Sequence, residues 1–132
     1  MIFRKYVAEF LGTFMLVFCG TGAIVINDVS GGTVGHSGIA VTFGLIVTAV
    51  IFTFGSLSGA HINPAVSIAF AVVSLFRKRD IFLYIIVQVL GAVFASAVLK
   101  LLFPEHQSLG GTIPAGSYWQ SFVLETILTF IL

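Results

Sequence analysis

The sequence is short of charged residues and of cysteine. Only 8% of its 132 residues are Asp, Glu, Lys or Arg, whereas 58% are hydrophobic. Soluble domains carry about 25% charged residues, so this composition excludes an ordinary water-soluble surface and predicts an all-α integral membrane protein in contact with lipid. The formal net charge of +1 offers no basic surface for nucleic acid. The single cysteine, Cys19, excludes a disulfide framework within the chain.

Groups that would carry out chemistry are also missing. No His, Cys, Asp or Glu residues stand at metal-ligand spacing, and no nucleophile–base motif is present. We therefore expect no metal, no cofactor and no enzymatic activity. The sequence has no Asn-x-Ser/Thr glycosylation site. Together with the short basic lead and the compact loops, this predicts a bacterial inner membrane as the location.

Three long apolar segments occupy most of the chain, at about 7–26, 38–55 and 81–103. About 20 apolar residues are enough for a helix to cross a membrane. Polar, glycine-rich loops follow the first and third segments. A fourth segment begins after the aromatic pair Tyr118-Trp119, which is typical of a membrane interface, and the sequence stops inside it.

A polar interruption, S-L-S-G-A-H-I-N-P-A at 56–65, separates the second segment from a short apolar stretch. Asn63 is a preferred N-cap residue, and Pro64 suits the first position of a helix. The pattern therefore predicts a half-helix over 63–76. At 1.5 Å per residue it would be roughly 20 Å long, too short for the roughly 30 Å hydrocarbon core.

Basic residues favour a re-entrant path for this half-helix. If it enters and leaves on one side, Arg4, Lys5 and the run 77–79 all lie on the same side of the membrane, and only Lys100 lies near the other. The positive-inside rule then places the N-terminus in the cytoplasm. Non-helical backbone at membrane depth is tolerated where it is buried in protein or lines a water-filled cavity. The sequence thus predicts a pore or a substrate cavity.

An internal repeat links the first and fourth segments. Residues 9–16 and 125–132 both read E-x-x-x-T-F-x-L, and a glutamate within a membrane segment is costly and rare. The first unit, 1–117, holds three spans, so the second, which begins at 118, starts with the opposite orientation. Inverted repeats with broken helices are a transporter design. We therefore expect a second half to follow Leu132.

Four motifs together resemble the major intrinsic protein family, the aquaporins and aquaglyceroporins. They are A-E-F-L-G-T-F at 8–14, S-G-A-H-I-N-P-A-V at 58–66, Q-V-L-G-A at 88–92 and E-T-I-L-T-F at 125–130. The resemblance covers the whole chain in order. It implies two half-helices that meet at Asn-Pro-Ala boxes inside a six-helix channel, which assembles as a homotetramer. It also implies a solute that is water or a small neutral molecule.

The resemblance assigns roles to individual residues. Asn63 would donate its side-chain amide to the passing solute, and the backbone carbonyls of Gly59, Ala60 and His61 would accept hydrogen bonds from it. Phe43 resembles a member of the outer constriction. Pro64 and Ala65 would pack against the second box. Support of the re-entrant loops would come from Glu9, Gln88 and Glu125. No second box and no constriction arginine lie within the chain.

Plainer readings stand beside these roles. Asn63 and Pro64 could serve only as a helix cap, Phe43 could be ordinary packing, and the side chain of His61 could be structural or could gate with pH. His36 and His106 are expected to be solvated in outer loops.

The preferred function is a passive water channel in which the half-helix dipole disfavours cations and protons. A glycerol facilitator is the close alternative. A non-conducting half-channel or assembly partner is an alternative of another class.

Overall fold

The computed structural model describes residues 3–131, and these form an all-helical structure. Three of its helical segments, Phe3–Val29, Gly35–Ser58 and Lys78–Leu102, are long and apolar enough to cross a membrane. The all-α membrane fold class predicted from the sequence is therefore confirmed. The helices are α1 (Phe3–Val29), α2 (Gly35–Ser58), α3 (Pro64–Val72), α4 (Ile81–Leu102) and α5 (Tyr118–Ile131), with a 3-10 turn at Lys78–Asp80.

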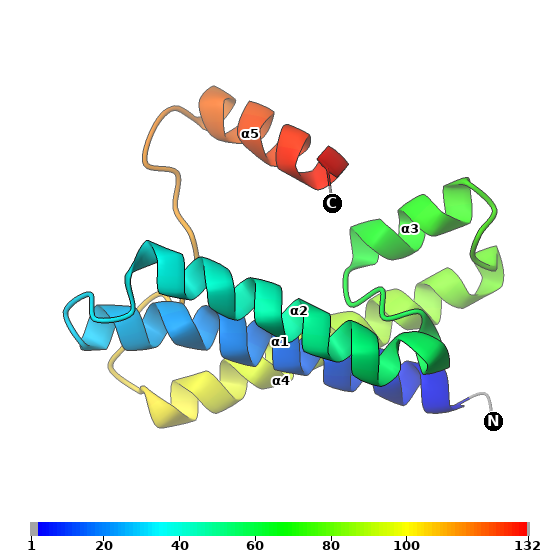
Figure 1. Ribbon diagram of the computed structural model, residues 1–132, viewed down its shortest axis with the longest axis horizontal. Helices are drawn as coiled ribbons and strands as arrows, with labels where there is room; N and C mark the ends of the chain where they lie inside the picture. The colour runs from blue at the N-terminus through cyan, green and yellow to red at the C-terminus, as the bar shows by residue number, and fades with distance from the viewer. Residues whose placement is uncertain (1–2, 132) are drawn as a thin grey trace.

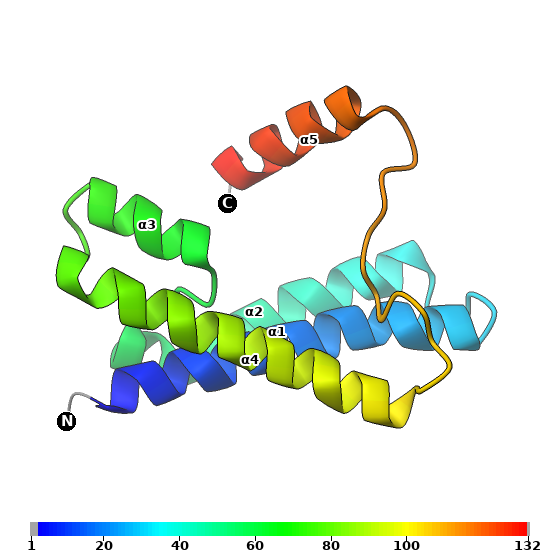
Figure 2. The same cartoon turned by 180° about the vertical axis from the view of Figure 1, so that it is seen from behind.

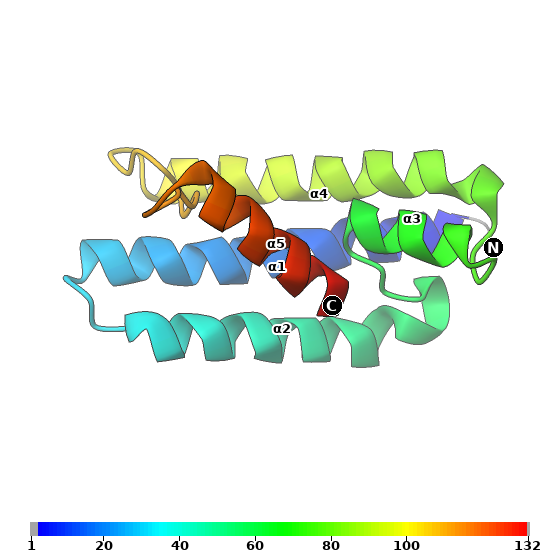
Figure 3. The same ribbon diagram turned by 90° about the horizontal axis from the view of Figure 1, so that it is seen from above.

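The three long helices lie side by side in one layer, with α1 between α2 and α4 (Figure 3). Helices α1 and α4 run in the same direction, and α2 runs in the opposite one (Figure 1). The short helix α3 lies on one face of this layer and packs against α4. Helix α5 lies over the same face, apart from the layer, and runs opposite to α1 (Figure 2). An inverted repeat requires that orientation, and the division into two repeats stays a prediction. Leu132, the last position of the internal sequence repeat, lies outside the described residues.

The long helices α1 and α2 extend three or four residues beyond the spans expected at 7–26 and 38–55, whereas α4 ends one residue before the expected 103. Polar residues at the edge of an apolar segment can continue a helix, because its backbone hydrogen bonds are made internally. At the start of α2, the Asn27 side chain accepts a hydrogen bond from Gly35 N at 2.8 Å.

The half-helix is shorter than expected, because α3 ends at Val72 rather than at 76. Ser74 adopts a left-handed φ of 62°, and the amides of Leu75 and Phe76 fold back to the carbonyl of Phe70 at 2.8 and 3.1 Å. This tight turn ends the helix. The nine residues of α3 correspond to about 14 Å, so α3 reaches only part of the way through a membrane.

The loop after α4 is tied to the loop after α1 by His106. Its Nε2 lies 3.2 Å from Asp28 Oδ2, and its Nδ1 accepts a hydrogen bond from Leu109 N at 2.9 Å. The side chain of His106 is only 10% exposed. The expectation of a solvated His106 was therefore wrong, and the reason is a contact between residues far apart in the sequence. His36 is exposed, as expected.

Close packing of α1 on α4 depends on Gly91. A Cβ at this position would lie 2.4 Å from the backbone oxygen of Phe10 and 3.2 Å from the amide nitrogen of Phe14. The backbones of the two parallel helices therefore touch here, which is a known use of small residues between membrane helices.

We expect Gly91→Ala to destabilise the protein by about 1–3 kcal/mol, because the added methyl group meets backbone that cannot move aside cheaply. Thermal unfolding in detergent measures this loss. Gly44→Ala is the matched control, since a Cβ at Gly44 would meet nothing within 4 Å. Equal midpoints of thermal unfolding for the two variants would contradict the proposed role of Gly91.

Candidate functional site: a groove beside the half-helix

The loop between α2 and α3 has an unusual backbone. Gly59, Ala60 and Ile62 all adopt positive φ angles, of 91°, 47° and 44°. Positive φ is readily available to glycine but is uncommon for alanine and is an outlier for a β-branched residue. Such a conformation persists only where the surroundings hold it, so the loop requires specific partners.

Glu9 is the main partner of this loop. The residue is completely buried, and its carboxylate accepts hydrogen bonds from His61 N at 2.9 Å and Ile62 N at 2.7 Å. Gln88 Nε2 donates to the same carboxylate at 2.8 Å. Hydrogen bonds to an ionised acceptor are stronger than those between neutral groups. The glutamate of α1 thus fixes the loop, and Gln88 joins both to α4.

The direction of the loop amides determines the direction of its carbonyls. In a planar trans peptide, the N–H and C=O groups point to opposite sides. Because the amides of His61 and Ile62 point at Glu9, the carbonyls of Ala60 and His61 point away from it. Among the described residues, no hydrogen-bond donor pairs with the carbonyls of residues 59–62. These oxygens are therefore free to accept hydrogen bonds from a solute.

Asn63 caps α3 with its side chain. It has an extended conformation, with φ −152° and ψ 128°, and its Oδ1 accepts a hydrogen bond from Ala65 N at 2.8 Å. Pro64 follows at the first helical position. The side-chain amide nitrogen of Asn63 donates to no group in residues 3–131, and the residue is half-buried. One side chain thus supplies a cap and, in addition, a free donor.

A groove of about 280 Å³ runs along this loop. One edge is formed by the loop residues 59–62, where the carbonyls of Ala60 and His61 point away from Glu9, together with Asn63. The facing wall is apolar and is formed by side chains from α1, α2 and α3: Leu16, Val47, Ile51, Val66 and Phe70. The groove therefore combines a row of hydrogen-bonding groups with a hydrophobic surface.

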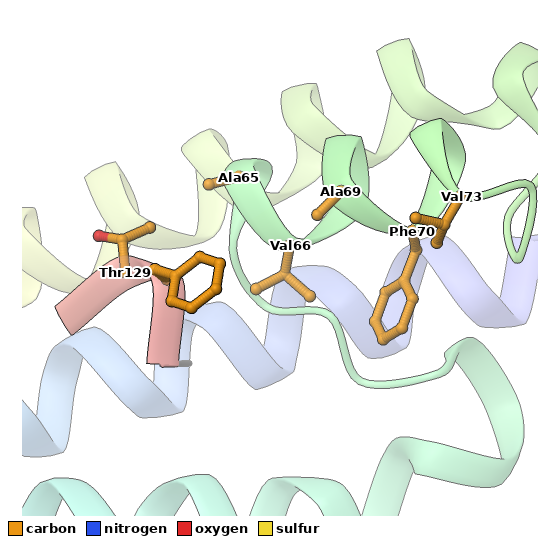
Figure 4. Close-up of a pocket in the computed structure, with 7 residues that line it drawn as sticks. Ala65, Val66, Ala69, Phe70, Val73 and Thr129 are labelled. Carbon is orange, nitrogen blue, oxygen red and sulfur yellow. The ribbon is translucent and has the colours of Figure 1, made fainter. Parts of the chain in front are cut away.

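A second cavity, of about 310 Å³, lies between α3 and α5. Figure 4 shows Val66, Ala69 and Phe70 on one side and Thr129 on the other. Ala65 lines this cavity rather than the groove, and Pro64 lines neither. The lining is almost wholly apolar, so this cavity is suited to packing rather than to a polar solute.

Two residues singled out from the sequence do not reach the groove. The ring of Phe43 lies against Gly20 of α1, where an added Cβ would come within 2.4 Å of its Cζ atom, and Phe43 does not line the groove. Its role in an outer constriction stays a prediction. Glu125 lies on an exposed face of α5 and makes no side-chain hydrogen bond within the described residues, so its support of a second loop also stays a prediction.

Two further residues of the site were missed from the sequence. Ser67 is completely buried and lies within hydrogen-bonding distance of Gln88, His61 and Asn63. The Tyr84 hydroxyl donates to the carbonyl of Ser58 at 2.8 Å, which fixes the end of α2. A serine four residues after the Asn63 cap was the available signal for Ser67, because that spacing returns to the same face of a helix. No local signal marks Tyr84.

An ion cluster holds the turn between α3 and α4 against the start of α1. Asp80 Oδ2 lies 2.7 Å from Lys5 Nζ and 3.0 Å from Arg77 Nε, and Tyr6 donates to Oδ1 at 3.1 Å. The Asp80 side chain is 10% exposed and that of Lys5 is 15% exposed. The carboxylate thus separates two like charges at the end of the molecule where α3 ends.

We expect Asp80→Asn to lower the free energy of unfolding by about 1–3 kcal/mol, since it leaves the largely buried Lys5 ammonium without its counter-ion. Chemical or thermal unfolding in detergent measures the change. Lys78→Gln alters an exposed cation of the same turn and is expected to have no effect. Equal stability of the two variants would contradict the importance of the cluster.

The chain as a whole is similar to proteins of a known family. The chain matches the family described as Major intrinsic protein over residues 1–132. It is 47% identical over 132 residues to aquaporin NIP1-3 of Oryza sativa subsp. japonica, covering 98% of this chain and 46% of that protein. It is 42% identical over 130 residues to nodulin-26 of Glycine max, covering 98% and 48%.

The chain spans about half the length of the curated relatives it matches. A third relative, the probable aquaporin NIP-type of Nicotiana alata, is 43% identical over 133 residues, covering 100% of this chain and 49% of that protein. These relatives are plant proteins, which conflicts with the expected bacterial origin. That expectation relied on a missing glycosylation site, a short basic lead and compact loops, and none of these features is specific to bacteria.

Proposed function

Because the chain belongs to the major intrinsic protein family, we propose that it lines a passive membrane pore for water, with the groove beside α3 as part of the conducting path. The observation that carries the proposal is the polar edge of this groove. It includes the carbonyls of Ala60 and His61, which point away from Glu9, and the side-chain amide of Asn63, and none of these groups has a hydrogen-bond partner among the described residues. Similar proteins are named aquaporins, and the family is one of channels rather than enzymes.

The arrangement provides what a water molecule needs on its way through lipid. Water gives up hydrogen bonds on leaving bulk solution, and each one left unmade is costly. The carbonyls accept from its O–H groups, and Asn63 donates to its oxygen. The N-terminus of α3 adds a partial positive charge at the same point, which disfavours cations and opposes proton transfer along a file of water.

A glycerol pore is the second candidate, and the apolar wall of the groove favours it. Leu16, Val47 and Ile51 face the polar edge. A polyol could place its carbon atoms against these side chains and its hydroxyl groups against the carbonyls.

Osmotic shifts on liposomes that contain the protein separate the two candidates. Under a sorbitol gradient, we expect shrinkage clearly faster than in protein-free liposomes. Under a glycerol gradient, a water-selective pore leaves the vesicles shrunken for a long time, whereas a glycerol pore lets them reswell quickly. Sorbitol shrinkage no faster than in the protein-free control, together with no faster reswelling in glycerol, would contradict both candidates and favour a non-conducting assembly partner.

Two finer proposals accompany the pore. The N-terminus lies in the cytoplasm, as supported by the basic residues gathered at that end, Lys5 and Arg77 among them. The protein assembles as a homotetramer, as the family resemblance implies. Exposed apolar side chains cover much of α2, including Leu45, Ile51 and Phe52, so this helix has ample surface for lipid or for another subunit.

A further inference from the structure

The side chain of His61 occupies a built pocket next to the groove. Its ring lies among three aromatic rings, those of Phe70, Phe76 and Tyr84, at centroid distances of 4.9, 4.7 and 5.3 Å. The residue is 7% exposed and lines the groove. Its orientation is therefore fixed by packing, and its two ring nitrogens face different surroundings.

The Nδ1 atom of His61 faces a buried polar network. It lies 3.1 Å from Ser67 Oγ, and the same hydroxyl lies 3.0 Å from Gln88 Nε2 and 3.2 Å from the carbonyl of Asn63. A serine hydroxyl has one hydrogen to donate and two lone pairs. All three contacts are satisfied only when the hydroxyl donates to Asn63 O and accepts from Gln88 and from a protonated His61 Nδ1.

The charge of Glu9 favours the same arrangement. The Glu9 carboxylate is bound to Gln88, which is bound to Ser67, so a negative charge lies at the Nδ1 end of the imidazole. An N–H group directed toward that end is stabilised, whereas a lone pair directed toward it is not. In a neutral histidine, protonation of one nitrogen leaves the other as an acceptor.

The Nε2 atom lies on the groove side. It would be 3.1 Å from a Cβ atom built on Gly59, and Gly59 is an exposed residue of the groove. Nε2 makes no hydrogen bond within the described residues. It also differs from the side-chain atoms there that are both unpaired and fully shielded from solvent, because it keeps some exposed surface. The atom is therefore not fully enclosed, and it lies beside Gly59, which lines the groove.

We propose that His61 contacts the permeating solute through its side chain: Ser67 and Gln88 hold the imidazole in the Nδ1–H tautomer, and Nε2 accepts a hydrogen bond from the O–H group of water or a small polyol passing Gly59. This inference rests on the proposed function and extends it, since the sequence assigned only the backbone carbonyl of His61 to the solute. Ser67 is a positioning residue that acts through His61.

The tautomer can be measured independently of conduction. In the full-length protein labelled with ¹⁵N-histidine and embedded in bilayers, we expect the His61 signals of a protonated Nδ1 and an unprotonated Nε2. Their loss in His61→Asn assigns them. Ser67→Ala should convert much of the signal to the other tautomer, and Ser67→Thr, which keeps the hydroxyl, should restore it. A native His61 protonated on Nε2 would overturn the inference.

The solute contact is tested by His61→Asn. An asparagine amide can occupy about the place of Nδ1 and keep the bond to Ser67, but it has nothing at the place of Nε2. At equal abundance in liposomes, we expect the flux to fall roughly two- to tenfold, as for one lost hydrogen bond. His36→Asn changes an exposed outer histidine and should conduct as the native protein does.

The two proposals fail in different ways. A His61→Asn flux equal to the native flux would overturn the solute contact and leave the proposed pore intact. A native protein that conducts neither water nor glycerol would overturn the pore and the contact together, and the NMR spectrum would then report only on the tautomer.

Discussion

Glu9→Ala is expected to cost about 3 kcal/mol or more of stability, because it removes the acceptor of three buried donors and each unmet donor costs about 1–3 kcal/mol. Those donors are the amides of His61 and Ile62 and the side chain of Gln88. Whole proteins are stable by only about 5–15 kcal/mol, so we expect a large drop in the unfolding midpoint and in membrane abundance.

Two further variants sharpen this prediction. Glu9→Gln keeps the size of the side chain but turns an NH₂ group toward at least one of the donors. We therefore expect a loss of stability between those of the native protein and Glu9→Ala. Glu105→Gln changes an exposed loop carboxylate and should leave the midpoint unchanged. A native unfolding midpoint for Glu9→Ala would show that the loop is held by something other than this carboxylate.

Asn63→Asp is expected to abolish most conduction while leaving the protein folded. The new carboxylate can still accept the hydrogen bond from Ala65 N, which caps α3. It has no amide hydrogen to offer the solute, and it places a charge in a poorly hydrated groove, which is costly. We expect a fall in water flux of more than about tenfold, which is about 1.4 kcal/mol, measured by stopped-flow light scattering at equal protein content.

Two further variants separate the two roles of the Asn63 side chain, which caps α3 and donates to the solute. Asn63→Ala removes both, and we expect the same loss of flux plus about 1 kcal/mol of stability. Asn27→Asp makes the identical change at the outer end, where Asn27 accepts a hydrogen bond from Gly35 N, and should conduct normally. Native flux in Asn63→Asp would remove Asn63 from the conducting path.

Local signals were enough to predict where the half-helix begins. Asn63 and Pro64 carry the cap in adjacent residues, and the structure starts α3 at Pro64. The end of α3 was placed four residues too late, because it depends on the left-handed turn at Ser74. The sequence offered no proline, and no glycine, to mark that turn.

Contacts between distant residues were predictable only in part. The buried Glu9 was conspicuous because carboxylates are rare in membrane segments. The network around Ser67 joins residues 6 and 21 positions apart, and the contact between His106 and Asp28 joins residues 78 apart. No periodicity within one helix carries that information, since it depends on how the helices pack.

As the proposed conducting path, the groove beside α3 passes a neutral solute and excludes protons. The most direct test measures osmotic shrinkage and proton leak in the same liposomes, with a pH-sensitive dye trapped inside. We expect fast shrinkage with a proton leak no greater than that of protein-free liposomes, and loss of the fast phase in Asn63→Asp. Fast proton entry together with water, or a fast phase unchanged in Asn63→Asp, would contradict it.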